Sequence, residues 1–90
     1  MGGSIGMESE NMIIEISYDK EADAVYLYLS NKKVAQSKEL DTQRVVDYSE
    51  DGEIRGIEFL AVSNGVTTDD LPHRDEIERI LFDRGIKTFA

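Results

Sequence analysis

The chain has 90 residues, no cysteine, a single histidine and a formal net charge of −9. This composition excludes disulfides, thiolate zinc sites and multi-histidine metal centres, and the negative charge disfavours contact with nucleic-acid phosphates or anionic membranes. We therefore expect a small cytoplasmic protein without a cofactor, which binds neither nucleic acid nor membrane and whose partner is another protein or a second copy of itself.

The first eleven residues differ in composition from the rest of the chain. They read MGGSIGMESEN, are rich in glycine, serine and glutamate, and lack a hydrophobic period. We expect residues 1–11 to form a flexible tail or to be the scar of an expression tag. Residues 12–90 are then expected to form a single small domain.

The chain continues with runs in which apolar and polar residues alternate, as they do in strands with one buried face. The first two runs, MIIEISY and AVYLYLS, are joined by the acidic segment DKEAD. The next run, VAQSKEL, is more polar and suits the edge of a sheet, where Lys38 and Glu39 would discourage aggregation. Two further runs, RVVDYS and EIRGIEFLAVS, flank EDG, which is a strong hairpin signal.

Two registers are open for this hairpin. A two-residue turn at Asp-Gly pairs Val46 with Ile57, whereas a three-residue loop with Gly52 as a bulge pairs Asp47 with Arg55. The second register adds a cross-strand ion pair worth roughly a few tenths of a kcal/mol. We therefore favour the three-residue loop.

After SNG the spacing of the apolar residues changes to the three-four repeat of a helix. Pro72 suits the first turn and Gly85 the position past the last turn, so we place the helix at about residues 72–84. The order of elements predicts an α+β fold, an antiparallel sheet of about four to five strands in a meander with one C-terminal helix packed on one face. The expected core comprises Val25, Leu27, Leu29, Ile57, Phe59, Ile77, Ile80 and Leu81.

Two long stretches of the chain carry a family resemblance. They are YDKEADAVYLYLS and VVDYSEDGEIRGIEFLAVS, with KVAQSKELD between them. Over residues 14–63 the chain resembles the DUF2283 family, small prokaryotic domains of unknown function. The matching positions are Tyr18, Asp19, Glu21, Ala22, Asp23, Ala24, Val46, Asp47, Tyr48, Asp51, Gly52, Gly56, Ile57 and Glu58. The chain departs from the family pattern at Tyr28, where arginine or lysine is usual, and at Ser49, where aspartate is usual.

This resemblance implies a small strand-rich fold to which no activity is assigned. Residues 66–90 lie outside the matching region, so the predicted helix is expected to be an extension found in a subset of the family. Because the family implies no catalytic residue, the candidate sites rest on residue types and spacing.

Asp19, Glu21 and Asp23 form the first candidate site. Closely spaced carboxylates bind hard cations such as Ca²⁺, and their spacing resembles the start of an EF-hand loop. That pattern fails at its sixth position, where Ala24 replaces glycine, and at its twelfth, where Ser30 replaces glutamate. We favour a turn whose aspartates bond the local backbone and keep a metal site as the alternative.

Asp47 and Glu58 form a possible acidic pair. Both lie within otherwise apolar strands, and an inward-facing carboxylate would have a raised pKa suited to acid-base work. Alternatively, both face solvent, or Asp47 pairs with Arg55. No cysteine or second histidine offers a matching nucleophile or base, which makes catalysis the less favoured interpretation.

Tyr26 and Tyr28 share the sheet face opposite Val25 and Leu27. If the helix covers the Val-Leu face, the tyrosines face outward, where their apolar rings and polar tips suit a protein interface. A second interpretation gives them only the role of covering the sheet. An uncovered aromatic face favours a weak symmetric homodimer that salt tightens, because salt screens the repulsion between two acidic chains.

The leading hypothesis for function is a non-catalytic protein-binding or assembly module. An antitoxin-like role, in which an acidic protein neutralises a basic toxin, is one version of it and rests on analogy. The alternative is a divalent-metal-binding protein or a small enzyme that uses the carboxylates of Asp19, Glu21, Asp23, Asp47 and Glu58.

Overall fold

The computed structural model describes residue 13 and residues 15–89, so the tail expected at residues 1–11 lies outside the described residues. In chain order the elements are β1 (Glu15–Asp19), β2 (Ala24–Tyr28), β3 (Gln36–Asp41), β4 (Arg44–Tyr48), β5 (Ile54–Leu60), the 3₁₀ turn η1 (Val62–Asn64), β6 (Val66–Thr67), α2 (Arg74–Asp83) and β7 (Thr88–Phe89).

The first five strands form one antiparallel sheet, in the order β1-β2-β5-β4-β3. The predicted α+β class, with a single C-terminal helix, is confirmed. The strand order departs from a simple meander, because β5 rather than β3 lies beside β2. The composition of the strands explains this order. β3 is polar and largely exposed and takes an edge, as predicted, whereas β5 has buried residues at Gly56, Ile57 and Phe59 and takes the centre.

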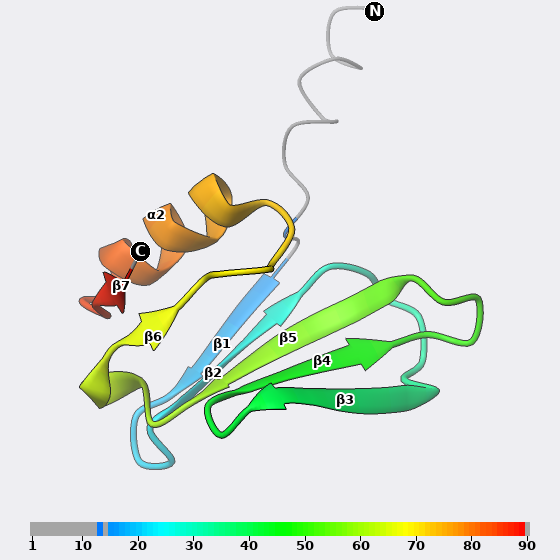
Figure 1. Ribbon diagram of the computed structural model, residues 1–90, viewed down its shortest axis with the longest axis horizontal. Helices are drawn as coiled ribbons and strands as arrows, with labels where there is room; N and C mark the ends of the chain where they lie inside the picture. Colours follow the sequence, from blue (N-terminus) through cyan, green and yellow to red (C-terminus); the bar gives the residue numbers. More distant parts are fainter. Residues whose placement is uncertain (1–12, 14, 90) are drawn as a thin grey trace, which may run out of the picture.

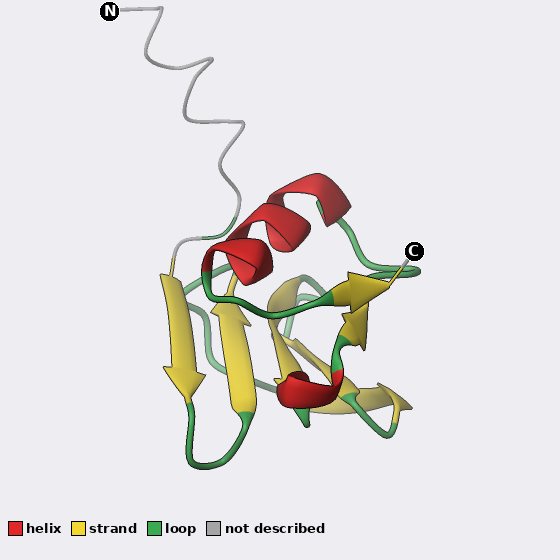
Figure 2. Ribbon diagram, turned by 90° about the vertical axis from the view of Figure 1, so that its left-hand side faces the viewer, coloured by secondary structure: helices red, strands yellow, loops and turns green. Residues whose placement is uncertain are grey.

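The sheet curls, and α2 lies with β6 and β7 on its concave side (Figures 1 and 2). Of the expected core, six residues are almost fully buried on this side: Val25, Leu27, Ile57, Phe59, Ile77 and Leu81. Leu29 and Ile80 are only partly buried. The core also includes Val46, Val62, Val66, Leu71 and Ile86, which the sequence analysis did not single out. The opposite, convex side of the sheet is covered by no helix of the described chain, and we call it the open face.

The helix is shorter than the predicted 72–84. His73 has a left-handed backbone (φ 57°), so helical geometry begins only at Arg74, and Pro72 lies in the preceding turn. The end of the helix follows the prediction. Gly85 has a φ of 77°, its N–H bonds the Phe82 carbonyl at 2.9 Å and the Ile86 N–H bonds the Leu81 carbonyl at 2.9 Å, which is the glycine-terminated helix end expected from the sequence.

The C-terminal segment pairs with the chain that follows the sheet. β6 and β7 form a two-stranded parallel pair, with Val66 opposite Thr88. The side-chain Nε2 of Gln43 holds the connection from β5 to β6 in place. It donates hydrogen bonds of 3.1–3.2 Å to the carbonyl oxygens of Leu60, Ala61 and Gly65. None of the helices within residues 13 and 15–89 is long and apolar enough to cross a membrane.

Candidate functional site

The hairpin between β4 and β5 sets up the centre of the open face. Its loop is the favoured three-residue one: the Ser49 N–H bonds the Glu53 carbonyl at 2.9 Å, and Gly52 has a φ of 89°. The favoured pairing of Asp47 with Arg55 is nevertheless wrong. A bulge at Arg55 shifts the register, so that Asp47 lies opposite Gly56 and the pairing of Val46 with Ile57 is restored.

This bulge places the Arg55 side chain on the open face, next to the position of Gly56. Its guanidinium carbon lies 4.8 Å from the ring centre of Tyr28 and 5.5 Å from that of Tyr26. Within this range a cation is attracted to the ring faces. The two rings also contact each other edge to face, with their centres 4.7 Å apart. Tyr26, Tyr28 and Arg55 therefore form one packed group, which we call the tyrosine–arginine centre.

Gly56 makes this arrangement possible. The Tyr26 side chain crosses β5 directly over Gly56, so closely that a Cβ atom at this glycine would lie 2.2 Å from the Tyr26 hydroxyl. By crossing, the hydroxyl reaches Asp47 on β4 and donates a 2.7 Å hydrogen bond to its Oδ2. A glycine at this strand position thus allows a side chain of β2 to reach the second strand along.

Two hydrogen bonds fix the Tyr26 hydroxyl, and a third holds its acceptor, Asp47. It donates to Asp47, accepts a 3.0 Å hydrogen bond from Arg55 Nη1, and Ser37 Oγ donates to the other oxygen of Asp47 at 2.5 Å. Burial raises the pKa of Tyr26 to about 12, and the hydrogen bond to Asp47 contributes to the same rise. The hydroxyl therefore stays protonated at neutral pH and acts as a fixed donor rather than as a base.

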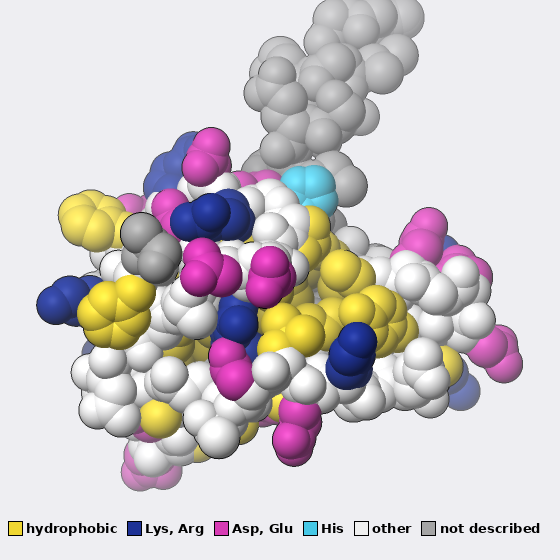
Figure 3. Space-filling view, viewed as in Figure 1, with side chains coloured by type: hydrophobic (Ala, Val, Ile, Leu, Met, Phe, Trp, Pro, Cys, Tyr) yellow, Lys and Arg dark blue, Asp and Glu magenta, His cyan; other side chains and the backbone are white. Residues whose placement is uncertain are grey.

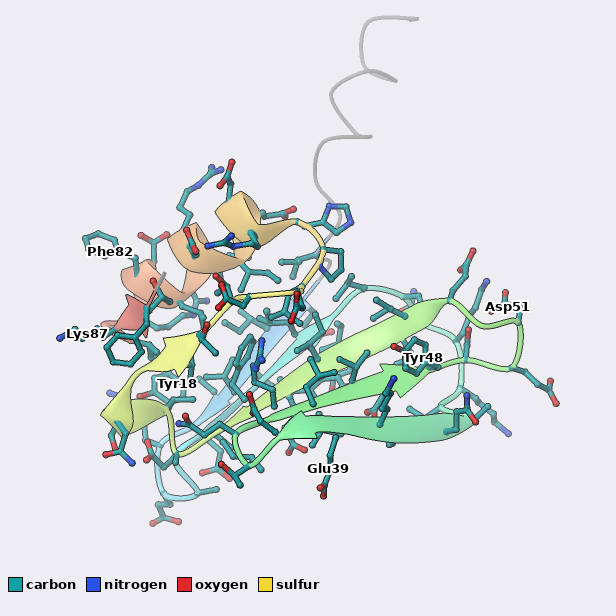
Figure 4. All side chains as sticks on the ribbon, in the orientation of Figure 1. Tyr18, Glu39, Tyr48, Asp51, Phe82 and Lys87 are labelled. Carbon is teal, nitrogen blue, oxygen red and sulfur yellow. The ribbon has the colours of Figure 1, made fainter. Side chains whose placement is uncertain are left out.

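Carboxylates surround this centre. The strand register places five of them on the open face, namely Glu15, Asp19, Glu39, Asp47 and Glu58. Glu39 points away from α2 in Figure 4. Beside Tyr26 lies a hollow of about 200 Å³, lined by Ser17, Asp19, Ala22, Ala24, Val25, Tyr26 and Glu58. The open face thus combines a rigid aromatic centre with an acidic surround.

The candidate metal residues Asp19, Glu21 and Asp23 lie at the turn between β1 and β2. Asp19 Oδ1 accepts 3.1 Å hydrogen bonds from the N–H groups of Glu21 and Ala22, as the turn interpretation expects. Asp23 points elsewhere and accepts hydrogen bonds from the N–H and hydroxyl of Ser63, at 3.0 and 2.7 Å. Within residues 13 and 15–89, no three His, Cys, Asp or Glu side chains converge in a group that could hold a metal ion.

The possible acidic pair lies on the open face, not in the core. Glu58 lies opposite Tyr26 on β2 and Val45 on β4, whereas Asp47 lies two pairs further along the strands, opposite Gly56. Asp47 is held by Tyr26 and Ser37. Both carboxylates and both tyrosines were predicted from the sequence, whereas Ser37 was not, and Arg55 was predicted to have a different neighbour. The bulge that redirects Arg55 has no local signal apart from Gly56.

The fold and the site define a small α+β domain with one face of its sheet under a helix and the other bearing an aromatic and acidic group. The chain belongs to the family described as Protein of unknown function (DUF2283), whose model matches residues 15–63. The match includes all five strands of the sheet and ends before α2. The family assignment expected from the sequence is therefore confirmed.

One curated relative is similar over part of the chain. It is named putative hypoxanthine phosphoribosyltransferase, from Methanosarcina mazei, and is 40% identical over 58 residues. The alignment covers 64% of this chain and 46% of the relative, so the chain spans about half the length of the protein it matches. No solved structure matches the chain.

Proposed function

We propose that this protein is a non-catalytic binding module whose open face takes up a protein partner with a basic surface. The observation that carries the proposal is the tyrosine–arginine centre, in which Arg55 lies over both Tyr26 and Tyr28 on a sheet face that no described helix covers. An antitoxin-like protein that neutralises a basic partner is one form of this function.

The residue types at the centre support an interface. Tyrosine and arginine are enriched among the residues that contribute most to protein binding, and such residues cluster near the centre of an interface. Here the Tyr26 hydroxyl and the Arg55 guanidinium are already held by hydrogen bonds, so association has little side-chain freedom left to remove. Such a centre suits recognition and offers no nucleophile.

The charge of the face supports the choice of partner. Five carboxylates lie on the open face, in a chain whose net charge is −9. They attract a basic surface over distances of about 10 Å at 0.1 M salt and repel an acidic one. The hollow beside Tyr26, with Asp19 and Glu58 in its lining, offers a place for a lysine or arginine side chain of that partner.

The same charge weighs against the activity in the name of the curated relative. A phosphoribosyl substrate carries phosphate, which needs cationic side chains or free backbone N–H groups. On the open face the cation is Arg55, whose Nε and Nη1 already donate to the Lys32 carbonyl and to Tyr26. We therefore do not extend phosphoribosyl transfer to this chain.

The test is a titration of the ¹⁵N-labelled chain with three short synthetic peptides of equal length, one rich in lysine and arginine, one neutral and one acidic. We expect only the basic peptide to shift amide signals, and the shifts to map to β1, β2, β5 and β4 rather than to α2. Tyr28→Ser should weaken this binding about tenfold, which corresponds to about 1.4 kcal/mol.

Charge variants separate the effect of the carboxylates on the open face from the effect of the net charge of the chain. Glu15→Gln with Glu58→Gln removes two charges from the open face, and Asp75→Asn with Asp83→Asn removes two exposed charges from α2. We expect only the first pair to weaken binding and to reduce its salt dependence. Equal effects of both pairs, or equal binding of the basic and acidic peptides, would contradict the proposal.

A further inference from the structure

The most exposed of the large hydrophobic side chains in the described residues lies far from the open face. Phe82, in the last turn of α2, is 77% exposed, and Phe89 in β7 is 45% exposed. Figure 3 shows hydrophobic side chains standing out at this end of the molecule, and Figure 4 shows Phe82 and Lys87 pointing away from the sheet. A phenylalanine ring left in water is costly, with about 25 cal/mol per Å² of apolar surface to be gained on burial. We call this end, from Phe82 to Phe89, the C-terminal corner.

A hollow lies directly beside the Phe82 ring. Its volume is about 390 Å³, and it is lined by Phe82, Gly85, Ile86, Lys87 and Thr88. Gly85 ends the helix with a left-handed backbone, and the space beside it is open, because a Cβ atom there would meet nothing within 4 Å. An apolar cavity of about 150 Å³ already accepts benzene, so a phenyl ring fits into a hollow of this size.

A ring next to a hollow that accepts a ring makes the corner complementary to itself. In a two-fold symmetric contact, every contact occurs twice. If residue i of the first chain touches residue j of the second, then residue j of the first chain also touches residue i of the second. One rotation can therefore place each Phe82 in the hollow of the other chain. Because Phe82 also lines its own hollow, the two rings would then pack side by side, in the offset or edge-to-face arrangement that aromatic pairs prefer.

Charge makes the corner a less repulsive place than the open face for two such chains to meet. Residues 79–90 carry the basic side chains Arg79, Arg84 and Lys87 and the acidic side chain Asp83, so both signs of charge are present at the corner of a chain whose net charge is −9. Contact through the open face would bring five carboxylates of each chain together. Contact through the corner keeps the acidic surfaces apart and can place Asp83 of one chain near a cation of the other.

We propose that two copies of this chain associate symmetrically through the C-terminal corner, with the Phe82 ring of each copy in the hollow beside Gly85 of the other. This surface differs from the one expected from the sequence, which was the face of Tyr26 and Tyr28. Self-association through the corner leaves both open faces free, so the dimer is a bivalent form of the binding module and can exist whether or not the open face binds a partner.

Sedimentation equilibrium of the full chain at low and high salt is the first test. We expect a dimer at about hundred-micromolar protein that tightens with salt, because salt screens the repulsion between the two acidic chains. Phe82→Ser should weaken the dimer at least tenfold and leave the melting temperature of the monomer unchanged, since the ring is exposed. The matched control is Val34→Ser, which removes a side chain that is 44% exposed elsewhere on the surface and should leave the dimer intact.

The contact itself is tested by mixing ¹³C-labelled and unlabelled chains. We expect intermolecular nuclear Overhauser effects from the Phe82 ring to the methyl groups of Ile86. A wild-type chain that stays monomeric at both salt concentrations would overturn the proposal, as would a dimer that Phe82→Ser does not weaken. Intermolecular signals from Tyr26 or Tyr28 would also overturn it, because they would place the dimer contact on the open face.

Discussion

The Tyr26 hydroxyl and the Asp47 carboxylate are joined by a 2.7 Å hydrogen bond, although β5 separates the two strands that carry them. The tyrosine reaches across because Gly56 offers no side chain in its path. The pair ties β2 to β4 over the open face and holds Tyr26 where Arg55 can lie against its ring. The hydrogen bond between Tyr26 and Asp47, which are 21 positions apart, thus depends on Gly56, although Gly56 takes no part in the bond.

Gly56→Ala should displace Tyr26 and break its bond to Asp47. The added Cβ would lie within 2.2–2.5 Å of three atoms of the tyrosine side chain, so the ring has to swing away. We expect a loss of about 1–3 kcal/mol in the free energy of unfolding, as for other over-packed sites. Urea unfolding measures this loss. In a Tyr26→Ser background, the same glycine substitution should cost little, and an equal cost in both backgrounds would show that the clash is not with Tyr26.

Tyr26 should ionise at a higher pH than an ordinary tyrosine. Burial and the bond to Asp47 raise its pKa from about 10 to about 12. Spectrophotometric titration should therefore show one late-ionising tyrosine, and Asp47→Asn should move its pKa down towards 10. Folding holds the phenol proton more tightly, so this contribution to stability is fully present below about pH 10 and is lost as the pH rises towards 12. A pKa near 10 for Tyr26 would contradict its half-buried position and its bond to Asp47.

Leu27→Ala tests which face of β2 lies in the core. Leu27 is 0% exposed, between Ile16 and Ile57 on the neighbouring strands. We expect the free energy of unfolding to fall by about 2–5 kcal/mol, because the substitution removes buried surface and leaves a cavity. Val34→Ala, at a site that is 44% exposed, is the control and should change little. A loss below about half a kcal/mol for Leu27→Ala would show that this face of β2 does not lie in the core.

Two neighbouring acids of the first turn should differ in their effect on stability. Asp23 bonds the N–H and hydroxyl of Ser63 at the start of η1, so Asp23→Ala should cost about 1 kcal/mol, as the loss of other capping side chains does. Glu21→Gln changes an exposed carboxylate and should leave stability and association nearly unchanged. Thermal melting of both variants is the measurement, and Glu21→Gln is the matched control.

The wild type and Glu21→Gln also test the metal alternative. Melting of the wild type with Ca²⁺, Mg²⁺ or Mn²⁺ should leave its midpoint unchanged, because a ligand raises the midpoint only if it binds the native state. A strong rise in the wild type that disappears in Glu21→Gln would instead support a metal site at Asp19, Glu21 and Asp23.

The sequence was sufficient for the features that depend on near neighbours. Alternation of apolar residues gave the strands, and Gly85 gave the helix end, because its positive φ is a local requirement. Gly52 likewise gave the three-residue loop. The start of the helix was placed two residues early, since Pro72 suits a first turn but the left-handed backbone of His73 has no sequence signal.

The sequence was insufficient for features that depend on pairing between distant segments. The place of β5 between β2 and β4 depends on how all five strands share the buried face of the sheet, and not on the sequence of any one strand. The three-residue loop by itself would pair Asp47 with Arg55. The bulge at Arg55 shifts the register by one residue, so that Gly56 lies opposite Asp47 instead. The contacts of Arg55 with Tyr26 and Tyr28 follow from both, so they could not be derived from the spacing of these residues.

The position of β5 also determines how the chain can fold. The pairs β1–β2, β3–β4 and β4–β5 each close a short loop, whereas β2–β5 closes the long loop that contains β3 and β4. Closing a longer loop costs more chain entropy, and pairings between distant residues slow folding. We therefore expect the N-terminal hairpin and the β3–β5 meander to form early and separately, and their docking along β5 to set the folding rate. Substitutions at this seam should slow folding, whereas those on edge strand β1 should mainly accelerate unfolding.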